Sequence, residues 1–112
     1  MKFLLLMYNR EDAFNEGDLK LEQRNAVALC HEIHAKGQFC SGNPLYPIDT
    51  AKSLRVRNGK AVVSDGPFAE TKEQLGGYVL VDVDTIEEAV EIASRFPSAR
   101  VGTVEVRAIE EL

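Results

Sequence analysis

The chain has 112 residues, of which 45% are apolar, and a formal net charge of −5. This length predicts one domain, residues 1–112, that buries only about two-thirds of its unfolded surface and would gain from a partner subunit. The acidic balance argues against nucleic-acid binding, which depends on clustered Lys and Arg. The densest basic group is interpreted as the solvated side of a hairpin and consists of Lys52, Arg55, Arg57 and Lys60.

Two cysteines and one short apolar run indicate the compartment. Cys30 and Cys40 have no CxxC neighbour, and two thiols without a secretory signal are typical of the reducing cytoplasm. The apolar run Phe3–Met7 is too short for a signal peptide or a membrane span. We therefore expect a cytoplasmic protein that has no membrane partner.

The first half of the chain predicts a strand and a long helix. Phe3–Met7 is apolar at both parities, which is typical of a strand covered on both faces. Asp18 is the expected cap of the helix, and Gly37 is its expected end. A short strand, 38–41, is expected to break at Gly42. The core stripe of the helix is expected to comprise Ala26, Leu29, Cys30 and Ile33.

The middle of the chain predicts a hairpin. Ser53–Arg57 alternates with period two, Lys60–Ser64 returns, and Asn58-Gly59 between them is the strongest short hairpin signal. Asp65-Gly66-Pro67 then favours a turn, because these residue types have fixed backbone preferences. One turn of helix is expected over 69–75.

The last third predicts strand, helix and strand. Tyr78–Val83 is the first of these strands, and Thr85 begins a capping box for the helix. Pro97 ends the helix, and Val101–Arg107 is the last strand. The apolar stripe of this helix is expected to comprise Ile86, Ala89, Val90 and Ala93.

The order β-α-β-(β-hairpin)-β-α-β predicts an α+β fold on the ferredoxin-like plan, β-α-β-β-α-β, with an inserted hairpin. Both amphipathic helices must cover the same face of the sheet. The other face needs its own cover, and a second copy of the chain is the economical one. We therefore expect a homodimer.

Strand parity places several polar side chains on that second face. In the last strand, Glu105 and Arg107 alternate with valines, and Tyr8 is in phase with Leu4 and Leu6 of the first strand. If two such faces stack, the charges enter an enclosed space and must pair or contact a ligand. The alternative is an ordinary Glu–Arg pair on a wet sheet edge.

The segment Asp65–Gly77 allows two interpretations as well. Asp65 is either a turn-former or a cleft acid, and Lys72 and Glu73 are either helix-surface charges or site residues. Phe68 is interpreted as a packing anchor. The functional hypothesis is one pocket for a small polar metabolite. Its acid–base groups are Asp65, Glu73 and Glu105, and its ligand-binding groups are Tyr8, Lys72 and Arg107.

No cofactor or metal is predicted. His31 and His34 share a helix face, but a metal site would need a third ligand, so they are interpreted as partly exposed helix residues. The chain has no phosphate-binding loop, dinucleotide fingerprint or nucleophile elbow, so kinase and hydrolase functions lack support.

Three blocks of the chain resemble a known family. They are MKFLLLMY at 1–8, RVRNGKAVVSDGPFAETKEQLGGYVLVDV at 55–83 and RFPSARVGTVEVRAI at 95–109. The central block resembles the DGPF branch of the YCII-related family of small bacterial proteins. The resemblance implies a dimeric α+β barrel, in which two ferredoxin-like sheets pack face to face, as in muconolactone isomerases and small monooxygenases.

The chain departs from the family at one functional pair. The classical YCII branch is proposed to use a His early in the first helix and an Asp just before a Pro at the end of the second. Here the first position falls within 21–24, which contains no His, and the second is Phe96. The family's pair is therefore not carried over to this chain.

Two functions follow. The first is a small-molecule binder or acid–base enzyme that uses a cleft of the dimer. The second is a non-catalytic dimeric module in transcription or stress regulation, because some relatives are encoded beside, or fused to, extracytoplasmic-function sigma factors. A buried acid with a raised pKa would favour the first. A cleft in which all charges are paired internally would favour the second.

Overall fold

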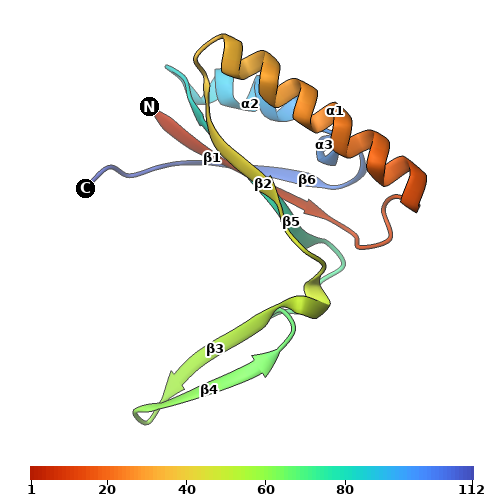
Figure 1. Ribbon diagram of the computed structural model, residues 1–112. Coiled ribbons are helices and arrows are strands. Elements are labelled where there is room, and N and C mark those ends of the chain that lie inside the picture. The colour runs from red at the N-terminus through yellow and green to blue at the C-terminus, as the bar shows by residue number, and fades with distance from the viewer.

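A computed structural model describes residues 1–112 and has the predicted α+β fold (Figure 1). The strands are β1 (Lys2–Asn9), β2 (Phe39–Pro44), β3 (Lys52–Arg57), β4 (Lys60–Asp65), β5 (Gln74–Asp82) and β6 (Thr103–Ala108). The helices are α1 (Glu16–Ala35), the 3-10 helix η1 (Ile48–Thr50), α2 (Ile86–Ser94) and α3 (Ser98–Val101). None of the helices is both long and apolar enough to cross a membrane.

Four strands form one antiparallel sheet in the order β2-β5-β1-β6. This is the ferredoxin-like order, with the first and fifth strands side by side at the centre. α1 and α2 lie on the same face of the sheet, as Figure 1 shows. The other face has no cover within the chain.

The core lies between the sheet and the helices, and twelve apolar residues form it. In β1, Phe3, Leu5 and Met7 are buried, whereas Leu4 and Leu6 are only partly buried. The expectation that β1 is covered on both faces is therefore wrong for a single chain. The remaining core residues are Leu29, Ile33, Val79, Val81, Val83, Ala89, Ile92, Ala93 and Phe96.

Helix α1 begins earlier than predicted. Asn15 is its cap, and the Asn15 side chain accepts a hydrogen bond of 2.8 Å from the backbone N–H of Asp18. Asp18 lies in the first turn, where a carboxylate favours the positive end of the helix dipole, so its prediction as the cap was wrong. Gly37 follows the helix with a φ of +74°, which confirms the predicted end.

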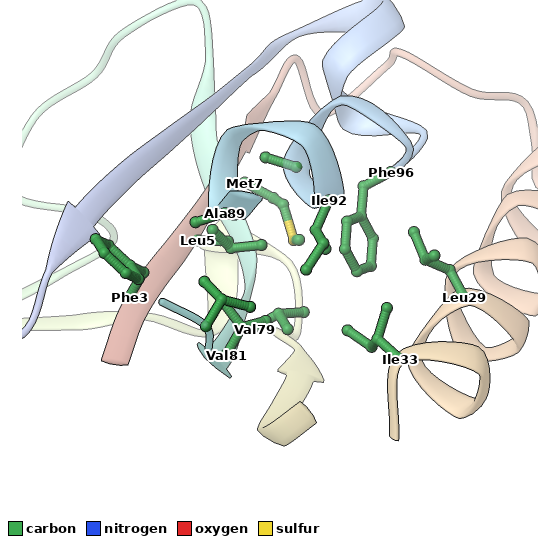
Figure 2. Packing of buried hydrophobic residues seen from close by; sticks show 12 residues of the cluster. Phe3, Leu5, Met7, Leu29, Ile33, Val79, Val81, Ala89, Ile92 and Phe96 are labelled. Atoms are coloured by element: carbon green, nitrogen blue, oxygen red, sulfur yellow. The ribbon is translucent and has the colours of Figure 1, made fainter. Parts of the chain in front are cut away.

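Helix α2 has the predicted cap but a different buried stripe. The hydroxyl of Thr85 accepts from the N–H of Glu88 at 3.2 Å. Ile86 and Val90 are exposed, because the face of α2 that packs on the sheet is rotated away from them and toward the residues nearer to Pro97. Figure 2 shows Phe96 with its ring between α2 and α1. The buried residues are Ala89, Ile92, Ala93 and Phe96.

Two further segments differ from the prediction. β2 continues to Pro44, because Gly42 and Asn43 remain paired with β5. The segment 69–75 forms no helix, and β5 already begins at Gln74. Phe68 is 82% exposed, so its interpretation as a packing anchor was wrong within one chain.

Strands β3 and β4 form a separate two-stranded sheet, which projects from the rest of the molecule (Figure 1). We call residues 52–65 the arm and the rest of the chain the body. Asn58 and Gly59 have φ of +51° and +73°, which are the signs that a type I′ hairpin turn requires, so the predicted hairpin is confirmed. The radius of gyration is 15.6 Å, against about 13 Å for a compact chain of this length. The arm accounts for the excess.

Candidate functional site

A cleft of about 630 Å³ lies between α1 and the β2–β5 side of the sheet. Its size is within the range of ligand pockets, roughly 300–1,000 Å³. It lies on the face that the helices cover, opposite to the face expected from the sequence. Its apolar lining includes Phe14, Leu19, Val27, Phe39, Val79 and Phe96.

Two glycines keep the floor of the cleft low. Gly42 pairs with Val79 and Gly77 pairs with Met7, so both glycines lie on the helix-facing side of the sheet. A Cβ on Gly42 would lie 2.9 Å from the carbonyl oxygen of Tyr78 and 3.0 Å from Cγ2 of Val79. No larger residue fits there without movement of the strand, and the space above the floor stays open.

Helix α1 forms the roof because only its second half packs on the core. Leu29 and Ile33 are its only buried residues, and both lie in its last two turns. Toward the N-terminus, Val27 is 53% exposed although it lines the cleft. The first half of α1 therefore stands off the sheet and leaves the cleft beneath it.

Asn9 lines this apolar cleft and carries a buried polar atom that has no partner. It is the last residue of β1, in phase with Met7, and its Oδ1 is buried without any hydrogen-bond partner. Buried polar atoms are almost always hydrogen-bonded, because an unmade bond costs about 1–3 kcal/mol. Asn9 is therefore the polar atom most in need of a ligand.

A carboxylate lies at the α3 end of the cleft. The side chain of Glu22, in α1, is only 18% exposed, and Nη2 of Arg100, in α3, donates to both of its oxygens at 3.1 and 3.2 Å. This pair ties the raised half of α1 to α3. Glu22 itself lines the cleft.

Cys30 and two histidines lie along the α1 wall of the cleft. Burial raises the pKa of the Cys30 thiol, because a thiolate is poorly solvated there. The ring of His34 meets that of Phe39 edge-on at 6.3 Å. No group of three or more His, Cys, Asp or Glu side chains is placed to hold a metal ion.

The open face of the sheet holds part of the predicted site. Glu105 lies opposite Leu6, Arg107 opposite Leu4, and Tyr8 opposite Thr103. The guanidinium of Arg107 is 3.9 Å from the Glu105 carboxylate. Glu73 joins this group through Thr103, whose hydroxyl donates to Glu73 Oε1 at 2.8 Å. The structure thus brings together Tyr8, Glu73, Glu105 and Arg107.

Asp65 and Lys72 lie apart from this group within one chain. Asp65 ends β4, and its carboxylate accepts from the ammonium of Lys52, its partner across the arm. Lys72 is exposed in the loop before β5. A structural explanation therefore exists for Asp65, and the catalytic and binding roles of all six residues stay a prediction.

Sequence reasoning missed Asn9, Glu22 and Arg100. Asn9 directly follows an apolar strand, where a polar residue at the end of a core-facing row is a usable signal. Glu22 lies within the window 21–24 to which the family resemblance pointed, but that window was searched for a His. Arg100 carries no local signal, because its partner is 78 residues away.

Residues 1–112 match the YCII-related domain over their whole length. The chain belongs to the YCII-related family. An uncharacterized protein of Rhizobium meliloti (strain 1021) is 34% identical over 112 residues, which cover 96% of this chain and 90% of that protein. This YCII-related relative carries no assigned activity that bears on the cleft.

A solved structure shares the fold. It is the 5-chloro-2-hydroxyhydroquinone dehydrochlorinase (TftG) of Burkholderia phenoliruptrix AC1100, in complex with 2,5-dihydroxybenzoquinone. The TM-score is 0.52 at 15% identity, and the match covers 98% of this chain and 94% of the other. At this identity, the likeness supports the fold of the YCII-related chain and not its activity.

Proposed function

We propose that this YCII-related protein binds a small molecule in the cleft between α1 and the sheet. The observation that carries the proposal is a largely apolar cleft of about 630 Å³ whose lining includes Asn9, a residue with a buried and unpaired Oδ1. Ligand sites typically combine apolar walls with a few placed polar groups. Here those polar groups are Asn9 and Glu22.

The lining indicates the chemistry of the ligand. Its apolar walls include three phenylalanines, Phe14, Phe39 and Phe96, so most of the ligand surface is apolar. The free acceptor of Asn9 requires a hydrogen-bond donor, such as a hydroxyl or an N–H group. The carboxylate of Glu22 disfavours an anion at the α3 end.

Two comparisons support a ligand in this place. The two positions of the pair proposed for the classical YCII branch, the window 21–24 and Phe96, both contribute to this cleft: Glu22 and Gln23 line it, and so does Phe96. The dehydrochlorinase of the same fold is described with a bound quinone, a small ring compound. A hydroxylated or amine-bearing ring compound fits both the lining and this precedent.

The test is a fluorescence titration with N-phenyl-1-naphthylamine, a neutral apolar probe that carries one N–H group. Ala26 lines the cleft, whereas Ala28, two residues later on α1, is exposed outside it. We expect saturable binding that Ala26→Phe weakens by about ten-fold or more, while Ala28→Phe leaves it unchanged. Absence of saturable binding, or equal effects of the two variants, would overturn the proposal.

A second candidate is acid–base chemistry on the open face. The hydrogen bond between Glu73 and Thr103 supports it, because it brings a carboxylate to the face that carries Tyr8 and Glu105. With Arg107 as a cationic group, this site would take a polar metabolite, and Asp65 and Lys72 would join it only from a second copy of the chain. Glu105→Gln would then impair binding of that metabolite far more than folding.

A homodimer in the cytoplasm remains our proposal for the assembly and its compartment. The uncovered face of the sheet, with partly buried Leu4, Leu6 and Leu80, supports a second copy there. The free thiols of Cys30 and Cys40 support a reducing compartment. If no small molecule binds either face, the regulatory module of the DGPF branch becomes the better proposal.

A further inference from the structure

The arm, residues 52–65, is the largest part of the chain with no role in the fold. Eleven of its twelve strand residues are exposed, and only Ser53 is partly sheltered, where its hydroxyl donates to the Gly66 carbonyl at 2.7 Å. An isolated two-stranded hairpin is marginally stable in water, since it has no third layer to bury its apolar side chains. The arm therefore lacks the packing partner that a hairpin normally has.

The two faces of the arm differ in chemistry. Directly opposed residues of an antiparallel pair share a face. Leu54 opposes Val63 and Val56 opposes Ala61, so one face is apolar except at the base of the arm, where Lys52 opposes Asp65. On the other face, Arg55 opposes Val62 and Arg57 opposes Lys60, which makes it basic.

The apolar face is open to solvent along its length. Leu54, Val56 and Val63 are 63, 60 and 62% exposed. At the base of the arm, the rings of Phe68 and Tyr46 are 82 and 88% exposed. Contiguous exposed apolar side chains of this kind mark an interaction surface.

Charge distinguishes the arm from the body. The arm contains four basic residues and one acid, in a chain with 18 acidic and 13 basic residues. The body is therefore more acidic than the chain as a whole, and the arm has the opposite sign. Opposite charge steers the arm toward a surface that resembles the body.

We propose that the arm packs its apolar face against the body of a second copy of the chain, so that two chains exchange arms about a two-fold axis. A second copy offers an acidic body to the basic arm, and the open sheet faces with Leu4, Leu6 and Leu80 bring the two bodies together. A two-fold exchange forms a closed dimer, since each arm occupies the equivalent site on the other chain and no further copy can be added. The inference extends the homodimer proposed above, because the arm would be part of the interface.

A nucleic acid is the occupant that the basic face would otherwise favour. The acidic body opposes this partner, because phosphates within about 10 Å of its surface would be repelled. The apolar face would also stay uncovered in such a complex. A second copy covers the apolar face, and its acidic body attracts the basic arm.

Val62 and Val63 provide a matched test. They are neighbours on β4, 50 and 62% exposed, and they lie on opposite faces of the arm. Sedimentation equilibrium of the full chain is measured for wild type, Val63→Asn and Val62→Asn. We expect a wild-type dimer, a dissociation constant raised about ten-fold or more by Val63→Asn, and little change from Val62→Asn.

Three outcomes would overturn the proposal. A dimer equally stable in both variants would mean that the sheet faces alone make the interface, and the homodimer would stand without the arm. A wild-type chain that stays monomeric at tens of micromolar would contradict both the arm exchange and the homodimer. Tight binding of a 20-nucleotide single strand that Arg55→Gln abolishes would make nucleic acid the occupant. Because the arm contributes nothing to the core, circular dichroism should report the same fold for all variants.

Discussion

Thr103 donates a hydrogen bond to Glu73 at 2.8 Å, between two residues that are 30 positions apart. Glu73 precedes β5 and Thr103 begins β6, so the bond spans the end of β1, which lies between those strands. Thr103 is itself the pairing partner of Tyr8. This hydrogen bond thus connects the loop between β4 and β5 to β6, the strand at one edge of the sheet.

Substitutions of this pair separate a structural role from a chemical one. Thr103→Val removes the donor and should lower the free energy of unfolding by about 0.5–1 kcal/mol, because the bond is solvent-exposed. Glu73→Gln keeps an acceptor oxygen, so urea unfolding should be unchanged. If Glu73 transfers a proton, Glu73→Gln alone abolishes turnover of the metabolite. A stability loss from Glu73→Gln as large as that from Thr103→Val would assign the carboxylate to structure.

Asn9→Leu should affect stability and ligand binding in opposite directions. Leu has the same branching and number of side-chain heavy atoms as Asn and removes the unpaired buried oxygen, so we expect the ligand-free protein to gain about 1 kcal/mol in thermal or urea unfolding. Binding of N-phenyl-1-naphthylamine should weaken by roughly three- to ten-fold, since the partner of its N–H is lost. A destabilised Asn9→Leu protein with unchanged binding would show that the amide has a structural partner.

The two cysteines should react at different rates with iodoacetamide. Cys40 is exposed, whereas Cys30 lines the cleft and burial raises its pKa. Alkylation requires the thiolate, so Cys30 in a Cys40→Ser background should react slowly at neutral pH and faster as pH rises through its raised pKa. N-phenyl-1-naphthylamine should protect Cys30, and mass spectrometry should report unchanged labelling of Cys40 in wild type.

The same shift links Cys30 to stability. Its pKa is higher in the folded chain than in the unfolded one. The stability that the buried Cys30 thiol contributes is therefore fully present at pH values below the ordinary thiol pKa. It is lost as the pH rises through the raised pKa of the folded chain. Unfolding free energies that fall more steeply at alkaline pH in wild type than in Cys30→Ala would agree with this sign.

Phe68→Ala tests the arm's base. The ring is 82% exposed within one chain, so its removal should hardly change the unfolding midpoint of the dilute monomer. At concentrations where the chain dimerises, the same variant should raise the dissociation constant, as truncation of an aromatic interface residue does. A loss of about 3 kcal/mol in the monomer would instead place Phe68 in a core.

The sequence was most informative where local chemistry decides the structure. Asn58-Gly59 requires positive φ at both residues, and the hairpin has it. The end of α1 at Gly37 and the cap of α2 at Thr85 follow from single residue types in the same way. Element order then restricted the sheet to one arrangement.

The cleft could not be predicted in this way. Its volume depends on how far α1 stands off the sheet, and that distance is set by the packing of Leu29 and Ile33 in the core, which no local sequence pattern specifies. Parity arguments directed attention to Glu105 and Arg107, because charges on a strand are conspicuous. The helix-facing polar residue, Asn9, lies two positions beyond the apolar run Phe3–Met7 and outside the predicted strand.

Two glycine substitutions should change stability in opposite directions, and this comparison tests the join between β1 and β6. A Cβ on Gly102 would collide with the carbonyl oxygen of Tyr8 and lie 2.9 Å from Oδ1 of Asn9. Both neighbours belong to β1, so the strand or the α3–β6 turn must move, and we expect Gly102→Ala to cost about 3 kcal/mol. Gly17 lies inside the first turn of α1, and the nearest atom to its added Cβ is Asn15 Oδ1 at 3.6 Å.

Gly17→Ala should therefore stabilise the chain by up to about 1 kcal/mol, through the lower entropy of the unfolded state. Urea unfolding of the two variants gives both values directly. Because the Gly102 clash also displaces Asn9, Gly102→Ala should lose probe binding while Gly17→Ala retains it. A Gly102→Ala protein as stable as wild type would mean that the turn before β6 yields freely, and that Asn9 is not held in place by Gly102.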